Sequence, residues 1–242
     1  TQSPESVGLC SQRLERVTRL LHGYVDRGQI AGFVTLIARR GAIVYCDAYG
    51  MADIEAGLPI RPDTLFRIYS MTKPITSAAL MTLYEEGLFG LDDPVHAYIP
   101  SFRDLKVFAG ETEGGLALAD PERPMTIRHL FTHTSGLVYP AQPLGIVEPH
   151  PVERLFGERL NARLGPDADW LFDADLEAFV GELAQLPLAH QPGTVWHYGV
   201  SIDVLGRLIE ILSGQTLGAF LRERLFEPLG MADTAFMAPA GK

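Results

Sequence analysis

Apolar residues recur every three to four positions in several stretches of the chain, which is the period of an amphipathic α-helix. The clearest stretch, residues 11–28, carries leucine, valine and tyrosine on one face and ends at Gly28. The same period, read with capping residues and helix-ending glycines, predicts helices at residues 70–87, 126–133, 152–164, 173–186, 200–214 and 216–230, and a short capped turn at residues 91–100.

Only two stretches have the pattern of β-strands. Residues 31–40 and 41–50 are rich in β-branched and aromatic residues and meet at Arg40-Gly41, which predicts a hairpin. Residues 103–125 mix Gly, Glu and Pro and are expected to form an irregular excursion. A lone hairpin is marginally stable in water and has two open edges. We therefore expect another chain, or further parts of a longer polypeptide, to complete the sheet.

The stretch from Ser70 to Gly87 combines a helical pattern with a chemical one. Pro74 is tolerated only in the first turn of a helix, so the helix is expected to begin at about Ser70. Lys73 then lies about one turn further on, on the same face. An amine close to a hydroxyl can take its proton, and a helix N-terminus favours the negative charge that develops. The alternative is a solvated helix start with Ser70 as its N-cap.

Composition limits the possible functions. The formal charge of −10 and the absence of a basic run argue against nucleic acid and against an anionic membrane surface. No apolar run approaches the ~18 residues of a membrane span, and no signal peptide is visible, which favours the cytoplasm. There is no Gly-rich nucleotide motif and no paired-cysteine metal site, so neither cofactor nor metal is expected. The two cysteines, Cys10 and Cys46, are interpreted as buried free thiols.

Two other reactive patterns have simpler explanations. Ser201 lies in the start of a G-x-S-x-G pattern, but Asp203 replaces the last glycine and the surroundings are helical. His129 and His133 have the i, i+4 spacing of zinc ligands, but Leu130 occupies the position where a zincin has Glu. Packing or hydrogen bonding is therefore the favoured role for these histidines.

Tyr198 is a second candidate for catalysis. It follows the Pro192-Gly193-Thr194 turn and precedes a helix, and such element ends often direct side chains into a cleft. A tyrosine near an ammonium group has a lowered pKa and can act as a general base. From spacing alone, a core tyrosine that packs beneath the following helix remains the alternative.

Four features together resemble a known superfamily. They are FRIYSMTK at residues 66–73, LFTHTSGL at residues 130–137, and PGT at residues 192–194 followed by Tyr198. Their order and spacing are similar to those of the serine β-lactamases and penicillin-binding proteins, and most of all to the family VIII carboxylesterases, which are similar to class C β-lactamases. The likeness extends over nearly the whole chain.

This resemblance implies an α+β fold of the β-lactamase/DD-peptidase type, with an antiparallel sheet flanked by helices and a helical subdomain. Residues 1–62 would begin the sheet subdomain, residues 63–213 would form the helical subdomain with the active-site motifs, and residues 214–242 would return to the sheet subdomain. The chain looks like the N-terminal part of this fold. The remainder, in the same or a separate chain, would then complete the sheet and the oxyanion hole.

The resemblance also implies roles for single residues. Ser70 would be the acylated nucleophile and its N–H half of the oxyanion hole. Lys73 would help to deprotonate Ser70, and Tyr198 would act as base and then as proton donor to the leaving group. Val200 stands where class C enzymes have the Asn of Tyr-x-Asn, which suits an esterase better than a β-lactamase. The third motif of the family, on a later strand, is missing from residues 1–242.

We therefore expect a serine hydrolase that cleaves short-chain esters through an acyl-enzyme. A β-lactamase, a D-amino-acid peptidase or an acyltransferase on the same scaffold is the first alternative, and a non-catalytic binding or assembly homologue is the second. The proline-rich residues 139–170 are expected to shape the substrate pocket. Within them we expect Tyr139 and Ile146 to contact substrate, with further apolar lining from Leu144, Val147 and Phe156.

Overall fold

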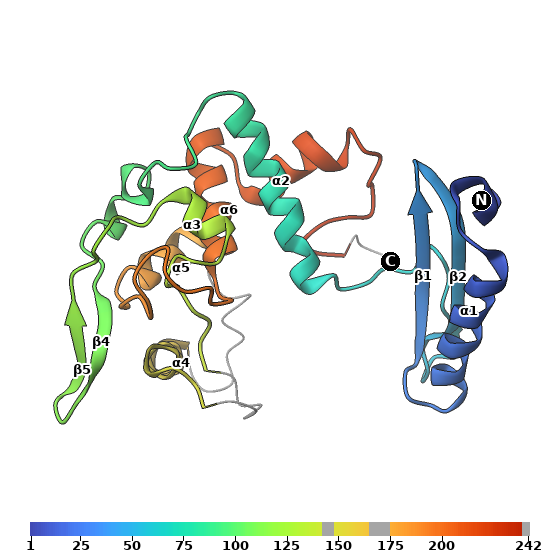
Figure 1. Ribbon diagram of the computed structural model, residues 1–242, viewed down its shortest axis with the longest axis horizontal. Coiled ribbons are helices and arrows are strands. Elements are labelled where there is room, and N and C mark those ends of the chain that lie inside the picture. Colours follow the sequence, from blue (N-terminus) through green and yellow to red (C-terminus); the bar gives the residue numbers. More distant parts are fainter. Residues whose placement is uncertain (142–147, 165–174, 239–242) are drawn as a thin grey trace. The chain divides into compact units, whose positions relative to one another are not determined.

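The computed structural model describes residues 1–141, 148–164 and 175–238. The chain divides into two compact units, residues 1–67 and residues 68–241 (Figure 1). Both units contain helices and antiparallel strands, which is the α+β class expected from the sequence. The expected return of residues 214–242 to the sheet subdomain of the complete fold stays a prediction.

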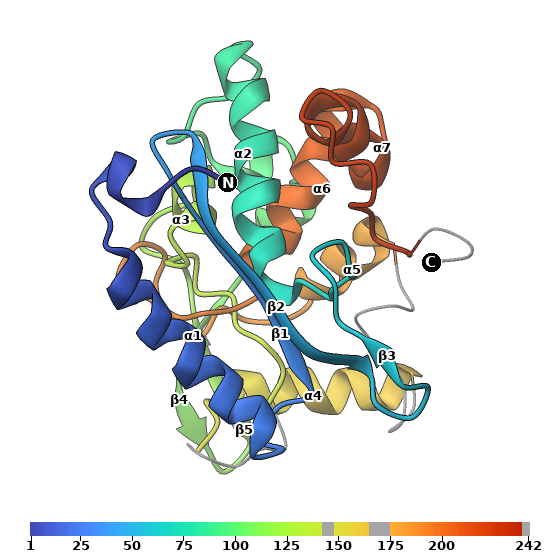
Figure 2. The same cartoon turned by 90° about the vertical axis from the view of Figure 1, so that its right-hand side faces the viewer.

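The first unit is a three-stranded antiparallel sheet with a helix packed against it (Figure 2). Its strands run in the order β1 (Gly32–Arg39), β2 (Ala42–Asp53) and β3 (Leu58–Pro59), and helix α1 (Ser11–Asp26) contacts β2. A single 3-10 turn, η1 (Pro4–Val7), precedes α1. The predicted hairpin at residues 31–50 is confirmed, and the short β3 is a third strand that the hydrophobic pattern did not predict.

Polar side chains join α1 to β2. The Tyr45 hydroxyl lies 2.6 Å from Thr18 Oγ1, and Asp47 Oδ2 lies 2.9 Å from His22 Nε2. Because side chains alternate along a strand, Cys46 points to the other face. Both Cys46 and Cys10 are exposed free thiols, so the expectation of buried cysteines was wrong.

The second unit is mainly helical and contains the predicted catalytic residues. Its helices are α2 (Thr72–Glu85), α3 (Ile127–Phe131), α4 (Pro151–Leu164), α5 (Leu176–Leu183), α6 (Ser201–Ser213) and α7 (Leu217–Leu221), with 3-10 turns η2 (Tyr69–Met71), η3 (Val95–Ala97) and η4 (Pro100–Phe102) and a π-helical turn η5 (Arg222–Phe226). The predicted helix at residues 216–230 therefore ends earlier, and its second half is π-helical.

Helix α6 lies at the centre of this unit. It packs against α2, α3, α5 and α7, and Figures 1 and 2 both show it beside α2. Leu205 and Ile209 of α6 and Leu80 of α2 are fully buried in one continuous core. Burying side chains of this size is worth roughly 1.5–3 kcal/mol each, so this packing fixes α2 against α6.

Residues 103–125 form a hairpin and not the irregular excursion expected from their composition. Strands β4 (Val107–Thr112) and β5 (Gly115–Ala119) pair antiparallel, with an irregularity between Phe108 and Gly110. The strands are short, largely exposed and interrupted by glycine, so they lack the alternating apolar pattern that identifies a strand in sequence.

A cluster of three histidines, His150, His190 and His197, links the start of α4 to the residues that precede α6. Glu153 Oε1 lies 3.1 Å from His197 Nε2, and His197 Nδ1 lies 3.0 Å from His190 Nε2. The ring of His150 packs edge-on against both His190 and His197. Burial lowers the pKa of His150 and of His190, and the charges of the neighbouring imidazoles lower it further. The folded protein therefore favours the neutral form of both rings.

This cluster predicts a loss of stability in acid. The unfolded chain, with histidine pKa values near 6.5, binds more protons than the folded chain, so the free energy of unfolding falls as the pH drops through 6.5. His190→Gln keeps a polar group but cannot be protonated. As the pH is lowered from about 7 to about 5, where histidine titrates, the free energy of unfolding of His190→Gln should therefore fall less than that of the parent.

Urea unfolding at a series of pH values would measure this effect. His96→Gln, which replaces an imidazole outside the cluster, is the matched control. Parallel pH profiles for the parent and His190→Gln would show that the cluster does not couple folding to pH.

Candidate active site

The predicted nucleophile lies where the chain turns into α2. Ser70 is exposed and lies in the 3-10 turn η2, two residues before the first residue of α2, Thr72, so the predicted helix start is confirmed to within two residues. Tyr69 before it has φ of 43°, in the left-handed region that non-glycine residues seldom adopt. This conformation costs roughly 1–3 kcal/mol, and it directly precedes Ser70 at the positive end of the helix.

The structure brings four of the five predicted site residues together. The Tyr198 hydroxyl donates to Ser70 Oγ at 2.7 Å. The Lys73 ammonium lies 4.7 Å from the centre of the Tyr198 ring, and it donates to the Tyr139 hydroxyl at 3.0 Å. Tyr139, predicted to contact substrate, is therefore a direct partner of Lys73. Ile146 lies outside the described residues.

The charge of Lys73 controls the ionisation of this group. Burial on its own would raise the pKa of Tyr198, but hydrogen bonds with Lys73 and Ser70 and the ammonium charge outweigh it and leave the pKa below its ordinary value. Burial likewise opposes the charge of Lys73, but hydrogen bonding with Tyr198 and Tyr139 leaves its pKa above the ordinary value. Burial raises the pKa of Tyr139. Lys73 is thus the charged ammonium, and Tyr198 is the tyrosine prepared to lose its proton.

Asp203 is a further charged residue of the site that sequence reasoning did not identify. It lies in the first turn of α6, and burial raises its pKa to about 6, while the Lys73 charge opposes this shift. Its carboxylate raises the pKa of both Tyr198 and Tyr139. The only sequence signal was an acidic residue in a helix first turn, which normally indicates favourable dipole interaction rather than a site.

Backbone hydrogen bonds hold the segment that carries Tyr198. The N–H groups of Ala189, Gly193 and His197 donate to the carbonyls of Gly136, Thr134 and His133, at 2.8, 2.7 and 2.9 Å respectively. Residues 189–197 therefore lie along residues 133–136. Gly199 follows at a point of close contact, because a Cβ there would lie 2.5 Å from the carbonyl oxygen of Leu137.

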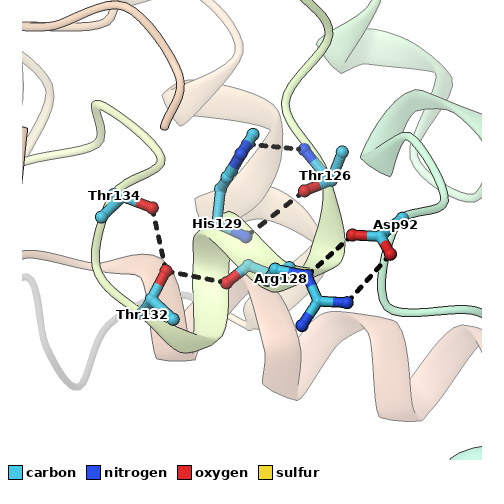
Figure 3. Close-up of polar contacts among 6 residues, drawn as sticks. All are labelled: Asp92, Thr126, Arg128, His129, Thr132 and Thr134. Carbon is cyan, nitrogen blue, oxygen red and sulfur yellow. Dashed lines mark hydrogen bonds and ion pairs between the residues drawn. The ribbon is translucent and has the colours of Figure 1, made fainter. Parts of the chain in front are cut away.

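The start of α3, which includes His129, is also held by local contacts (Figure 3). Thr126 Oγ1 accepts from the His129 N–H at 3.4 Å, and His129 Nδ1 accepts from the Thr126 N–H at 3.1 Å, which makes a reciprocal cap at the start of α3. Arg128 forms a bidentate pair with Asp92. His129 therefore has the hydrogen-bonding role expected for it.

Among the described residues, no group of three acidic, histidine or cysteine side chains is placed to hold a metal.

The competing serines are not available as nucleophiles. Ser135 and Ser201 are both fully buried, and their hydroxyls hydrogen-bond to each other at 2.8 Å. Phe156, expected in the acyl pocket, is a buried core residue instead, because α4 packs it against the second unit's interior.

No single helix among residues 1–141, 148–164 and 175–238 is both long and apolar enough for a membrane span. Helix α6 and the helical segment Leu217–Phe226 pass that test only when taken together, and they are bent by 80° relative to each other.

Comparisons with known proteins identify the family and the fold of the chain. The β-lactamase family model matches residues 17–242. Esterase EstB of Burkholderia gladioli is 40% identical over 212 residues, which are 87% of this chain and 48% of EstB. The structure of EstCE1, "a hydrolase with promiscuous acyltransferase activity", matches with a TM-score of 0.74 and 34% identity over 93% of this chain and 53% of EstCE1.

A third relative is the simvastatin synthase LovD of Aspergillus terreus, which matches with a TM-score of 0.74 and 29% identity over 94% of this chain and 55% of LovD. The chain thus spans about half the length of the relatives that it matches. These matches confirm the expected β-lactamase-like fold. Because the family model covers nearly all of its residues, the chain belongs to the β-lactamase family.

Proposed function

We propose that the protein is a serine hydrolase of carboxylic esters, with Ser70 as nucleophile, Tyr198 as general base and Lys73 as the ammonium that activates Tyr198. The observation that carries this proposal is the 2.7 Å contact between the Tyr198 hydroxyl and Ser70 Oγ, with the Lys73 ammonium against the Tyr198 ring. A base within hydrogen-bond reach of a nucleophile, itself oriented by a third group, is the arrangement that activates a serine.

The geometry supports a two-step acyl transfer. Tyr198, ionised beside Lys73, takes the Ser70 proton while Oγ bonds to the ester carbonyl carbon. The oxyanion forms near the N–H of Ser70, at the positive end of α2. Tyr198 then returns the proton to the alkoxide as the C–O bond breaks and the alcohol leaves. A water molecule, deprotonated in the same way, hydrolyses the acyl-enzyme and regenerates Ser70.

The relatives favour esters as the substrate class. EstB is an esterase by name, and EstCE1 combines hydrolase with acyltransferase activity. Val200 is fully buried in the core and offers no donor to a β-lactam side chain. Transfer of the acyl group to an alcohol instead of water is the second candidate, because EstCE1 and the simvastatin synthase LovD share this scaffold. Both of these relatives are about twice as long as this chain. Their length supports the further proposal that additional polypeptide completes the sheet and the oxyanion hole.

Covalent labelling tests the nucleophile. A fluorophosphonate should form one adduct on the complete protein, and peptide mapping by mass spectrometry should place it on Ser70, the exposed serine beside Tyr198. Ser70→Ala should abolish labelling, while Ser77→Ala, one to two turns further along α2, should leave it unchanged. An adduct on Ser135 or Ser201 would refute the assignment.

Replacement of Lys73 and Tyr198 tests the proton transfer. Lys73→Ala and Tyr198→Phe should each lower kcat for a short p-nitrophenyl ester by about 10²-fold or more, since each removes part of one acid–base unit. The double variant should fall well short of the product of the two effects, because members of one unit are not additive. Near-parental turnover by Tyr198→Phe, with the melting temperature lowered, would make Tyr198 a packing residue.

Asp203→Asn tests the charge balance of the site. Removal of the carboxylate removes an influence that raises the pKa of Tyr198, so that pKa should fall. The acid limb of the kcat/KM profile should therefore move to lower pH. Glu210→Gln, which removes a carboxylate further along α6, is the control and should leave the limb in place. A shift to higher pH, or none, would exclude an electrostatic role for Asp203.

A further inference from the structure

His133 has an unusual backbone conformation. Its φ is 53°, in the left-handed region, although a side chain is present. Histidine enters this region more readily than most residues, but the conformation still costs free energy that the surroundings must offset. In this conformation His133 contacts Tyr198 and both of its neighbours in the chain.

These contacts lie on both sides of Tyr198 in the chain. The His133 carbonyl accepts from the N–H of His197 at 2.9 Å, and His133 Nδ1 accepts from the N–H of Gly199 at 3.4 Å. The two residues that flank Tyr198 are therefore bound to one residue. The ring of His133 also packs against that of Tyr198, with the ring centres 5.0 Å apart.

The second contact requires a particular state of the imidazole. A nitrogen that accepts from a backbone N–H carries a lone pair, so the proton of the neutral ring is on Nε2. Burial lowers the pKa of His133, and the Lys73 ammonium lowers it further. The groups that face the ring are this ammonium from α2 and the aromatic rings of Tyr198 and Trp196. These surroundings keep the ring neutral and Nδ1 free to accept.

We propose that His133 is a positioning residue for the reaction: its left-handed backbone and neutral Nδ1 bind the chain on both sides of Tyr198 and so place the phenol oxygen on Ser70. This inference rests on the proposed function, because it assigns a role relative to Tyr198 as base. His133 does not contact the substrate or exchange a proton with it.

Three substitutions separate the backbone from the side chain. Asn is tolerated in the left-handed region, and its Oδ1 can take the place of Nδ1 as acceptor. Gly relieves the backbone but provides no acceptor. Gln also has an amide, but its longer side chain carries the acceptor further from the backbone. If His133 serves only to form the turn, Asn and Gly should both preserve activity. If His133 positions Tyr198 through Nδ1, only Asn should preserve it.

The experiment compares His133→Asn, His133→Gly and His133→Gln in the complete protein. The readouts are kcat, KM and the rate of fluorophosphonate acylation across pH. His133→Gly should lower kcat and the acylation rate by roughly 10-fold or more with little change in KM, because misplacement of a base by a fraction of an ångström costs this much. His133→Asn should recover most of the rate, and His133→Gln should not. Equal rates for His133→Gly and His133→Asn would overturn the proposal.

A measurement that does not depend on activity accompanies these rates. The ¹⁵N shifts of His133 in the labelled parent protein, assigned by its loss in His133→Asn, report which ring nitrogen carries the proton. A proton on Nε2 at neutral pH supports the proposal, and a proton on Nδ1 overturns it even if His133→Gly or His133→Gln fails to fold. A parent protein that does not acylate would refute the proposed function, while the tautomer would still decide whether His133 binds Gly199.

Discussion

The packing of α6 against α2 is the interaction on which the site depends. Ser70 and Lys73 lie at the start of α2, whereas Tyr198 and Asp203 flank the start of α6, more than a hundred residues later. Buried aliphatic side chains of both helices form one core, so the two helix starts are held at a fixed separation. A contact of 2.7 Å between side chains from two segments requires this rigidity, because a shift of one ångström would break it.

The positive charge of Lys73 affects the ionisation of two tyrosines near Ser70. The Lys73 ammonium touches two tyrosines, yet their pKa values move in opposite directions. Tyr139 is more deeply buried, so desolvation raises its pKa and keeps its proton in place. Tyr198 is more exposed, so the hydrogen bonding and charge of Lys73, together with hydrogen bonding to Ser70, outweigh desolvation and lower its pKa. The same charge therefore leaves the two tyrosines with pKa values shifted in opposite directions because they differ in burial.

The sequence predicted the parts of this site that depend on local spacing. Ser70 and Lys73 follow from a helical period and one proline, and the hairpin at residues 31–50 follows from β-rich segments and a turn. The pairing of Ser70 with Tyr198 depends on tertiary packing, so spacing alone left a core tyrosine as the alternative. Asp203 had only the ordinary signal of an acidic residue in a helix first turn, since its altered pKa arises from burial that only the packed helices create.

The strands β4 and β5 were missed for a different reason. Their residues are mostly exposed, β4 is interrupted by Gly110 and β5 contains no polar residue, so no alternation of apolar and polar residues marks them. What stabilises the hairpin is contact with a distant segment: Phe108 N–H donates to the Leu188 carbonyl, and the Leu188 N–H to the Lys106 carbonyl. Such long-range pairing cannot be read from local composition.

Backbone strain is concentrated at the same site. Among the described residues, three that are not glycine have positive φ: Arg40, Tyr69 and His133. Arg40 lies in a hairpin turn, where this conformation is ordinary. The other two adjoin the reacting groups, one immediately before Ser70 and one bound to both neighbours of Tyr198. Strain of this kind persists only where surrounding structure compensates for it. The packing of α6 against α2 fixes the segments on which Ser70 and Tyr198 lie, and we infer that it also holds Tyr69 and His133 in their left-handed conformations.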